Sequence, residues 1–305
     1  MTHDPSEGVS AGLRHFPEHR GYMEEAEVTG LLAIKRGRVV LERYARGNDD
    51  STVWASRSMA KSITSLMIGA AIQSKHIRSV DDPVSLHVPE LEGTFYHGVT
   101  LRHCLQMTSG IPYSEDYQDR ASDVARLQAC TVEGRPGAFL DFLRDLCSRW
   151  DRKTNPPRSV FNYCSADSVV LGLALERATG EIAPVRLEHA LWRRLGMERD
   201  AFWNLEAPGG SAFTASGFGA TLRDYGGLAL FVLGGARLPD GTRIVPEGLM
   251  QESLARRLRS TPAVPMDSSG GSMSIAARCP TRSERARSSS EAATRCSTRW
   301  AMQAR

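Results

Sequence analysis

Ser58 and Lys61 are the residues of this 305-residue chain whose types and spacing most directly suggest chemistry. They are three residues apart at the start of an apolar-patterned run, so on a helix both side chains lie on one face. A serine hydroxyl is a poor nucleophile until a base takes its proton, and a neutral lysine is a suitable base. Because such a pair is common by chance, a solvated serine and lysine on a surface helix is the alternative.

A second pair, Tyr163 and Ser165, follows about 100 residues later, in a loop just before another predicted helix. A phenol beside a lysine can accept and donate a proton in turn, which suits a relay from the nucleophile to a leaving group. Both residues also have structural alternatives. Ser165 is a good N-cap for the following helix, and Tyr163 has the pattern of a half-buried aromatic.

The elements around these residues alternate between strand and helix patterns. Residues 1–25 are polar and irregular, and residues 30–35 and 39–44 predict two strands that pair as an antiparallel hairpin. Helical patterns dominate residues 76–205, with clear segments at 99–107, 138–147, 167–179 and 190–195. Residues 209–218 are rich in glycine and serine, and residues 221–224 resemble a capping box before an apolar run.

Composition excludes several classes of function. The hydrophobic and charged fractions, 41% and 24%, are ordinary for a globular protein, and the net charge of +3 gives no reason to expect a nucleic-acid partner. No stretch of about 18 apolar residues predicts a membrane helix.

The first residues show no signal-peptide pattern, so we expect a cytoplasmic protein. The six cysteines form no C-x-x-C pair, so we expect reduced thiols and no metal site.

With these motifs in place, the chain resembles the serine hydrolases of the β-lactamase and penicillin-recognising fold. Within that fold it is most similar to the 6-aminohexanoate-dimer hydrolase and class C-related esterase group. The family's Ser-x-x-Lys motif is matched by Ser58 and Lys61, and its Tyr-x-Asn or Tyr-x-Ser motif by Tyr163 and Ser165. Further agreement lies at residues 105–111, 171–180, 191–197 and 241–246, so the resemblance covers about residues 28–255.

The resemblance implies an α/β (α+β) fold, with a mainly antiparallel sheet flanked by helices and an inserted all-helical subdomain. After the irregular segment 1–25, a hydrolase domain would cover residues 26–270. Its sheet region would use residues 26–75 and 206–270, and its helical region residues 76–205. We expect the active site in the groove between the two regions.

The resemblance also implies acyl transfer on a small amide or ester, without a cofactor and without a nucleic-acid or membrane partner. Ser58 would attack the carbonyl, Lys61 would act as base, and Tyr163 would pass the proton to the leaving group. The backbone N–H of Ser58 would form half of an oxyanion hole. Substrate-binding candidates are Ser165, Tyr113 and Tyr117, although a solvated polar loop around Tyr113 and Tyr117 is the alternative.

The composition changes near residue 270. Residues 278–305 hold seven arginines, two glutamates and eight serines or threonines, and no strand periodicity continues there. The family's third motif, a Lys-Thr-Gly, His-x-Gly or Gly-x-Gly strand late in the chain, is not found after residue 255. We therefore expect the C-terminal strands to be missing and residues 271–305 to be a low-complexity tail read out of frame. The alternative functions are an inactive truncated or frameshifted member and a catalytically dead, ligand-binding descendant.

Overall fold

A seven-stranded sheet is the centre of the computed structural model, which describes residues 19–149, 161–255, 272–278 and 297–301. The strand order is β2-β1-β6-β7-β3-β5-β4, and each pairing is antiparallel except that of β3 with β7. The strands are β1 Val28–Lys35, β2 Arg38–Tyr44, β3 Val53–Ala55, β4 Phe202–Trp203, β5 Phe218–Thr221, β6 Ser272–Arg278 and β7 Ser297–Ala301. The predicted architecture, a mainly antiparallel sheet flanked by helices, is confirmed.

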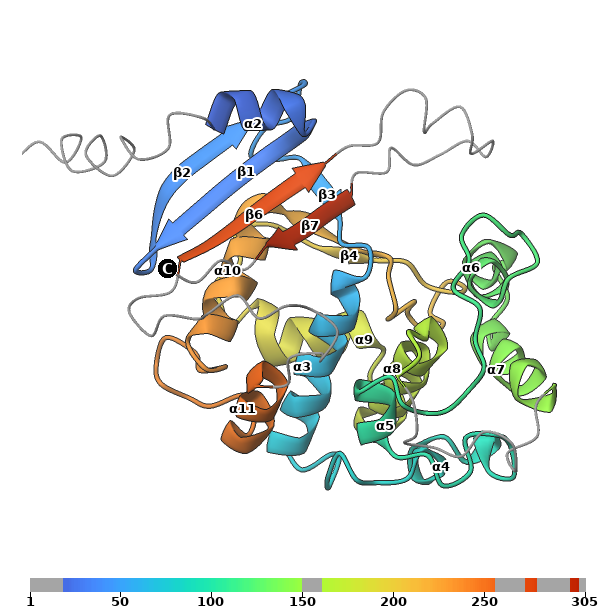
Figure 1. Ribbon diagram of the computed structural model, residues 1–305. Coiled ribbons are helices and arrows are strands. Elements are labelled where there is room, and N and C mark those ends of the chain that lie inside the picture. The colour runs from blue at the N-terminus through green and yellow to red at the C-terminus, as the bar shows by residue number, and fades with distance from the viewer. Residues whose placement is uncertain (1–18, 150–160, 256–271, 279–296, 302–305) are drawn as a thin grey trace, which may run out of the picture.

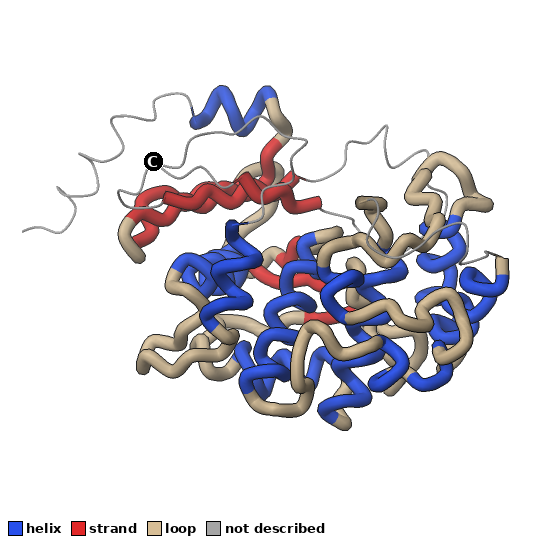
Figure 2. Tube along the Cα trace, turned by 60° about the horizontal axis from the view of Figure 1, so that its bottom comes forward, coloured by secondary structure: helices blue, strands red, loops and turns tan. Residues whose placement is uncertain are grey.

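The helices lie on both sides of this sheet (Figure 1). Helix α2 lies on one side of β1 and β2, while α3 and α10 lie on the other, with the remaining helices beyond them (Figures 1 and 2). Their bounds are α2 His19–Glu25, α3 Met59–Gln73, α4 Val84–His87, α5 Leu101–Leu105, α6 Asp123–Glu133, α7 Ala138–Ser148, α8 Ser165–Thr179, α9 Ala183–Leu187, α10 Leu222–Leu233 and α11 Glu247–Ala255. A short 3₁₀ turn, Pro89–Leu91, and a π-helical turn, Glu188–Trp192, complete the set. Within the described ranges, none of these helices combines the length and apolar character needed to cross a membrane.

The predicted hairpin of β1 and β2 is confirmed. Arg36 and Gly37 form its turn with φ values of 52° and 75°, both in the left-handed region. A two-residue turn of this kind matches the right-handed twist of the strands, and glycine adopts it without a steric penalty.

Buried hydrogen bonds connect the sheet to the helices behind it. Trp54 of β3 is fully buried, and its indole N–H donates to the Thr29 hydroxyl of β1 at 3.2 Å. The hydroxyl of Tyr225, on α10, donates to the Trp54 carbonyl at 2.9 Å. Since buried polar groups without partners destabilise a fold, these bonds fix β3, and with it the start of α3.

Three expectations about segment boundaries need correction. Part of the segment 1–25 is helical, because α2 places Met23 in a small apolar cluster with Val28, Leu31 and Leu41, a tertiary contact that local pattern does not show. Residues 1–18 lie outside the described residues. Strand β4 falls inside the region 76–205, which was expected to be all helical. Only two residues long, it carries too little periodicity to be recognised.

The third correction concerns the C-terminal strands. The sheet region was expected to end at residue 270 and the strands after it to be missing, yet β6 and β7 occupy the sheet between β1 and β3. Strands pair through backbone N–H and C=O groups, so a segment without apolar alternation can still take a position in the ladder. The hypothesis that residues 271–305 are read out of frame concerns the coding DNA and stays a prediction, and most of that segment lies outside the described residues.

The packing of α3 gives a stability prediction. A Cβ atom added at Gly69 would lie 2.6 Å from Val245 Cγ1, which is a steric clash. Either helix α3 or the β-branched Val245 side chain would have to move to remove it. We expect Gly69→Ala to lower the free energy of unfolding by about 1–3 kcal/mol. Gly248→Ala is the matched control, because nothing lies within 4 Å of its added Cβ. Urea denaturation measures both, and equal stability of the two variants would contradict the packing.

Candidate active site

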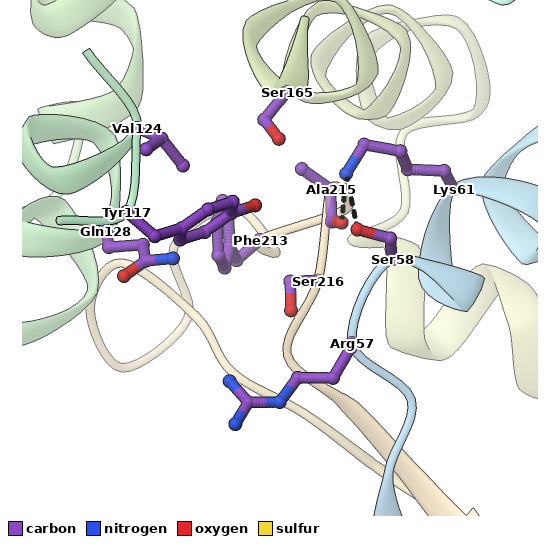
Figure 3. A pocket seen from close by; sticks show the side chains of 10 residues that line it. All are labelled: Arg57, Ser58, Lys61, Tyr117, Val124, Gln128, Ser165, Phe213, Ala215 and Ser216. Carbon is purple, nitrogen blue, oxygen red and sulfur yellow. Dashed lines mark hydrogen bonds between the residues drawn. The ribbon is translucent and has the colours of Figure 1, made fainter. Parts of the chain in front are cut away.

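A pocket of about 240 Å³ lies between the start of α3, helices α6 and α8, and the segment 213–216 (Figure 3). The groove was expected between the sheet region and the helical region, and the pocket lies there. Its lining combines cationic, hydroxyl and apolar side chains, namely Arg57, Ser58, Lys61, Tyr117, Val124, Gln128, Ser165, Phe213, Ala215 and Ser216.

Ser58 lies directly before the first residue of α3, at the end of a sharp change in chain direction after β3. The preceding residue, Arg57, has a φ of 50°, a left-handed conformation that residues other than glycine rarely adopt. The N–H of Ser56 donates to the Phe218 carbonyl at 2.7 Å and holds this turn against β5. Backbone strain of this kind is concentrated at functional sites, where the surrounding structure maintains it.

Lys61 directs its amine at Ser58. Its Nζ donates to Ser58 Oγ at 3.2 Å and to the Ala215 carbonyl at 2.8 Å (Figure 3). Burial lowers the pKa of Lys61 to about 8, while the Glu115 carboxylate and the Cys164 side chain act in the opposite direction. A substantial fraction of the amine is therefore neutral in mildly alkaline solution.

The Ala215 carbonyl is held in place by two threonines. The Thr64 hydroxyl on α3 donates to the Thr214 carbonyl at 3.1 Å, and the Thr214 hydroxyl donates to the Ser168 carbonyl on α8 at 2.7 Å. Segment 213–216 is thus bonded to both α3 and α8. This is why a residue 154 positions away in the chain can orient the Lys61 amine.

Tyr163 lies beside this pair. Its ring centroid is 5.0 Å from Lys61 Nζ, within the range of a cation–π contact when the amine is charged. Burial raises the pKa of the Tyr163 phenol, and a hydrogen bond with the Ser58 side chain opposes the rise. The structure therefore brings together Ser58, Lys61 and Tyr163, which are far apart in the sequence.

The three substrate-binding candidates have different positions. Ser165 lines the pocket, and it is the first residue of α8 rather than its N-cap, which is Cys164. Tyr117 also lines the pocket and is 60% exposed. Tyr113 is not brought to the pocket: it is only 7% exposed, packs in the main core, and its hydroxyl has no hydrogen-bond partner among the described residues.

Sequence reasoning missed several lining residues. Arg57, Gln128, Phe213, Ala215 and Ser216 carry no motif of their own. The glycine- and serine-rich composition of residues 209–218 was the available signal for the last three, because it marks a segment that can follow an irregular path. Helix α6, which supplies Gln128, was not predicted.

A buried carboxyl lies on α8, close to the site. Asp167 has no exposed surface and accepts a hydrogen bond from the Tyr96 hydroxyl at 3.0 Å. Its second oxygen, Oδ2, is buried without a hydrogen-bond partner in the described structure. Burial raises the pKa of Asp167 to about 7, against the opposing hydrogen bonds.

Comparison with known proteins decides the family. The model of the Beta-lactamase family matches residues 20–272, which is most of the chain. The chain belongs to the β-lactamase family. A 6-aminohexanoate-dimer hydrolase of Paenarthrobacter ureafaciens is 30% identical over 257 residues, which are 83% of this chain and 63% of that relative. This β-lactamase family member therefore spans less than two thirds of the length of the curated relative.

Solved structures agree on the fold. A candidate 6-aminohexanoate-dimer hydrolase from Bacillus anthracis superposes with a TM-score of 0.67 at 20% identity, covering 78% of this chain and 62% of that one. A penicillin-binding protein from Bacillus halodurans gives a TM-score of 0.60 at 20% identity, with 83% of each chain covered. At these identities the likeness establishes the β-lactamase-like fold.

The buried Asp167 predicts a pH dependence of stability. Its pKa of about 7 in the folded state lies above the ordinary value of 3.8, so the folded state retains a proton that the unfolded state has lost. The free energy of unfolding of the wild type therefore falls as the pH rises from about 4 to about 7. Asp167→Asn has no carboxyl to titrate, so its free energy of unfolding lacks this pH dependence. The difference between variant and wild type should therefore shift in favour of the variant by on the order of 4 kcal/mol between about pH 4 and pH 8. Urea denaturation at several pH values measures the difference, and a constant difference would contradict the assignment.

Proposed function

We propose that this chain is a serine hydrolase that cleaves a small amide or ester through an acyl-enzyme on Ser58. The observation that carries the proposal is the contact of Lys61 Nζ with Ser58 Oγ at 3.2 Å, in surroundings that lower the pKa of Lys61 to about 8. An exposed lysine would stay protonated near neutral pH and could not take the serine proton. A desolvated amine beside the hydroxyl can do so.

In the proposed first step, the neutral Lys61 amine takes the proton of Ser58 as the serine oxygen attacks the substrate carbonyl. The backbone N–H of Ser58, at the N-cap of α3, would donate to the developing oxyanion. The C–O bond to serine forms, and the carbonyl π electrons move to the oxygen. When the tetrahedral intermediate collapses, they return to the carbonyl.

Collapse breaks the bond to the leaving amine or alcohol, which needs a proton to depart. Tyr163 has its phenol near both Ser58 and Lys61, so it can pass the proton from the lysine to the leaving group. Water then attacks the acyl carbonyl as Lys61 takes its proton. The bond from the carbonyl to Ser58 Oγ breaks, the proton returns to the serine oxygen, and the carboxylic acid leaves.

The substrate class follows from the pocket and from the relative. A volume of about 240 Å³ accommodates a small acyl group, with Ser165 and Tyr117 on the wall to contact it. A relay through Tyr163 is of greatest use when the leaving group is an amine, because an amine departs poorly as its anion. The 6-aminohexanoate-dimer hydrolase of Paenarthrobacter ureafaciens supports an amide.

The first prediction from this proposal concerns turnover. Ser58→Ala should abolish hydrolysis of p-nitrophenyl acetate, because no acyl intermediate can form, and Lys61→Ala should lower kcat/KM by at least about a thousandfold. Tyr163→Phe should lower turnover of an anilide more than that of the ester, since p-nitrophenolate leaves without a proton. Circular dichroism controls for folding. More than a tenth of wild-type activity in folded Ser58→Ala would overturn the proposal.

A second prediction concerns pH. Activity needs neutral Lys61, so kcat/KM for the ester should rise with pH and reach half of its maximum near pH 8. The direction follows from the base role, because protonation below the pKa removes the acceptor. A profile that is flat between about pH 6 and pH 10, in a protein that hydrolyses the ester, would exclude Lys61 as the base.

The alternative of a catalytically dead, ligand-binding descendant, or of an inactive truncated member, has its own signature. The altered composition after residue 270 is the observation that favours it. A folded wild-type protein that binds an amide ligand, and whose Ser58 does not react with an alkyl fluorophosphonate, would support that alternative.

A further inference from the structure

Glu115 is an acidic side chain at the edge of the proposed site, to which the proposed steps give no role. It lies in the loop between α5 and α6 and is partly buried. Its carboxylate accepts three hydrogen bonds: from the Ser165 hydroxyl at 2.6 Å, from the Ser165 N–H at 3.2 Å and from the Tyr117 hydroxyl at 2.7 Å. Two of the donors belong to side chains that line the pocket.

The first consequence is mechanical. The N–H of Ser165 is one of the donors in the first turn of α8 that have no acceptor within the helix. Cys164, at the N-cap, provides no side-chain acceptor for them. Glu115 accepts from this N–H, so a residue 50 positions earlier in the chain acts as the cap. A carboxylate at the N-terminus of α8 also interacts favourably with the dipole of that helix. Glu115 therefore holds the loop that carries Tyr117 against the helix that carries Ser165.

The second consequence is electrostatic. The titratable groups facing Lys61 from the surrounding elements are Glu115, Cys164 and Tyr163, and Arg57 adds a cation on the pocket wall. Burial lowers the pKa of Lys61, and two neighbouring groups raise it. The Glu115 carboxylate raises it more than Cys164 does. The same carboxylate raises the pKa of Tyr163. Glu115 thus acts on both groups that move the proton in the proposed steps.

We propose that Glu115 is a positioning residue of this site: it fixes Ser165 and Tyr117 on the pocket wall and holds a negative charge beside the Lys61 amine. The inference rests on the proposed function, in which Lys61 is the base, because the Glu115 charge would change the pH at which the Lys61 amine loses its proton. The test of Glu115 does not require the protein to turn over a substrate.

The chain has only four lysines, Lys35, Lys61, Lys75 and Lys153, so the Lys61 side chain can be followed directly. We suggest an NMR titration of the protein carrying ¹³C at lysine Cε, with the Lys61 signal assigned by its loss in Lys61→Arg. In the wild type the signal should titrate near pH 8. In Glu115→Gln, which keeps an acceptor oxygen but loses the charge, the midpoint should fall by about half a unit or more, because the opposing carboxylate is gone.

Asp116→Asn is the matched control. Asp116 is the next residue, carries the same charge and is exposed, but accepts a hydrogen bond from the Gln118 N–H at 2.8 Å within its own loop. This variant should leave the Lys61 midpoint unchanged. Glu115→Asp keeps the charge but shortens the reach to Ser165, so it should hold the Lys61 midpoint near the wild-type value. It is therefore the charge-retaining control at the same position.

The outcomes separate this inference from the proposed function. An unchanged midpoint in folded Glu115→Gln, or an equal fall in Asp116→Asn, would overturn the role of Glu115 and leave that of Ser58 intact. If Glu115→Gln does not fold, Glu115→Ala, which also removes the charge, takes its place, and an unchanged Lys61 midpoint in folded Glu115→Ala overturns the role as well. Conversely, a fall confined to Glu115→Gln supports Glu115 even in a protein that hydrolyses no ester.

Discussion

The arrangement of the pocket depends on the removal of one ammonium group, that of Lys61, from water. Desolvation of a charged amine costs several kcal/mol, so the folded state favours the neutral form and lowers the pKa. The contacts of Nζ with Ser58 Oγ and the Ala215 carbonyl compensate for part of the lost hydration. The Glu115 carboxylate compensates for another part through its charge. The balance leaves a lysine that changes protonation within the range of ordinary solution conditions.

This balance requires a rigid frame, because a small shift of the amine would readmit water. Helix α3 is buried along most of its length, and its first turn follows strand β3, whose Trp54 is fully buried. The bonds through Thr64 and Thr214 connect α3, the segment 213–216 and α8, and the bonds of Glu115 connect α8 to the loop of Tyr117. The site is therefore assembled from five separate stretches of chain, which only the complete fold brings together.

The sequence predicted the parts of the molecule that rest on local pattern. The hairpin, helices α3, α7 and α8, and the capped start of α10, where Thr221 accepts from the Asp224 N–H, all follow from periodicity and end signals within a few residues. The Gly180 C-cap, with a φ of 72°, belongs to the same group. The juxtaposition of Ser58 with Tyr163 came from family resemblance instead, because no local pattern relates two segments about 100 residues apart.

What the sequence did not predict depends on tertiary contact. Tyr113 and Tyr117 look equivalent in the chain, yet one is buried in the core and the other lines the pocket. The orientation of the loop decides between them, and Glu115 takes part in holding that loop. Strands β6 and β7 were missed for a related reason, since backbone pairing needs no apolar alternation. In the same way, the role of Ala215 depends on a carbonyl, which every residue carries.

We propose that burial makes Lys61 the base that activates Ser58. The most direct measurement is the rate at which an alkyl fluorophosphonate modifies the protein, with the adduct located by peptide mass mapping, in the wild type and in Lys61→Arg. The guanidinium of the variant stays protonated at every accessible pH. We expect a single adduct on Ser58 in the wild type, formed at least about a hundredfold faster than in the variant. Equal rates in the two proteins, or an adduct on another residue, would contradict it.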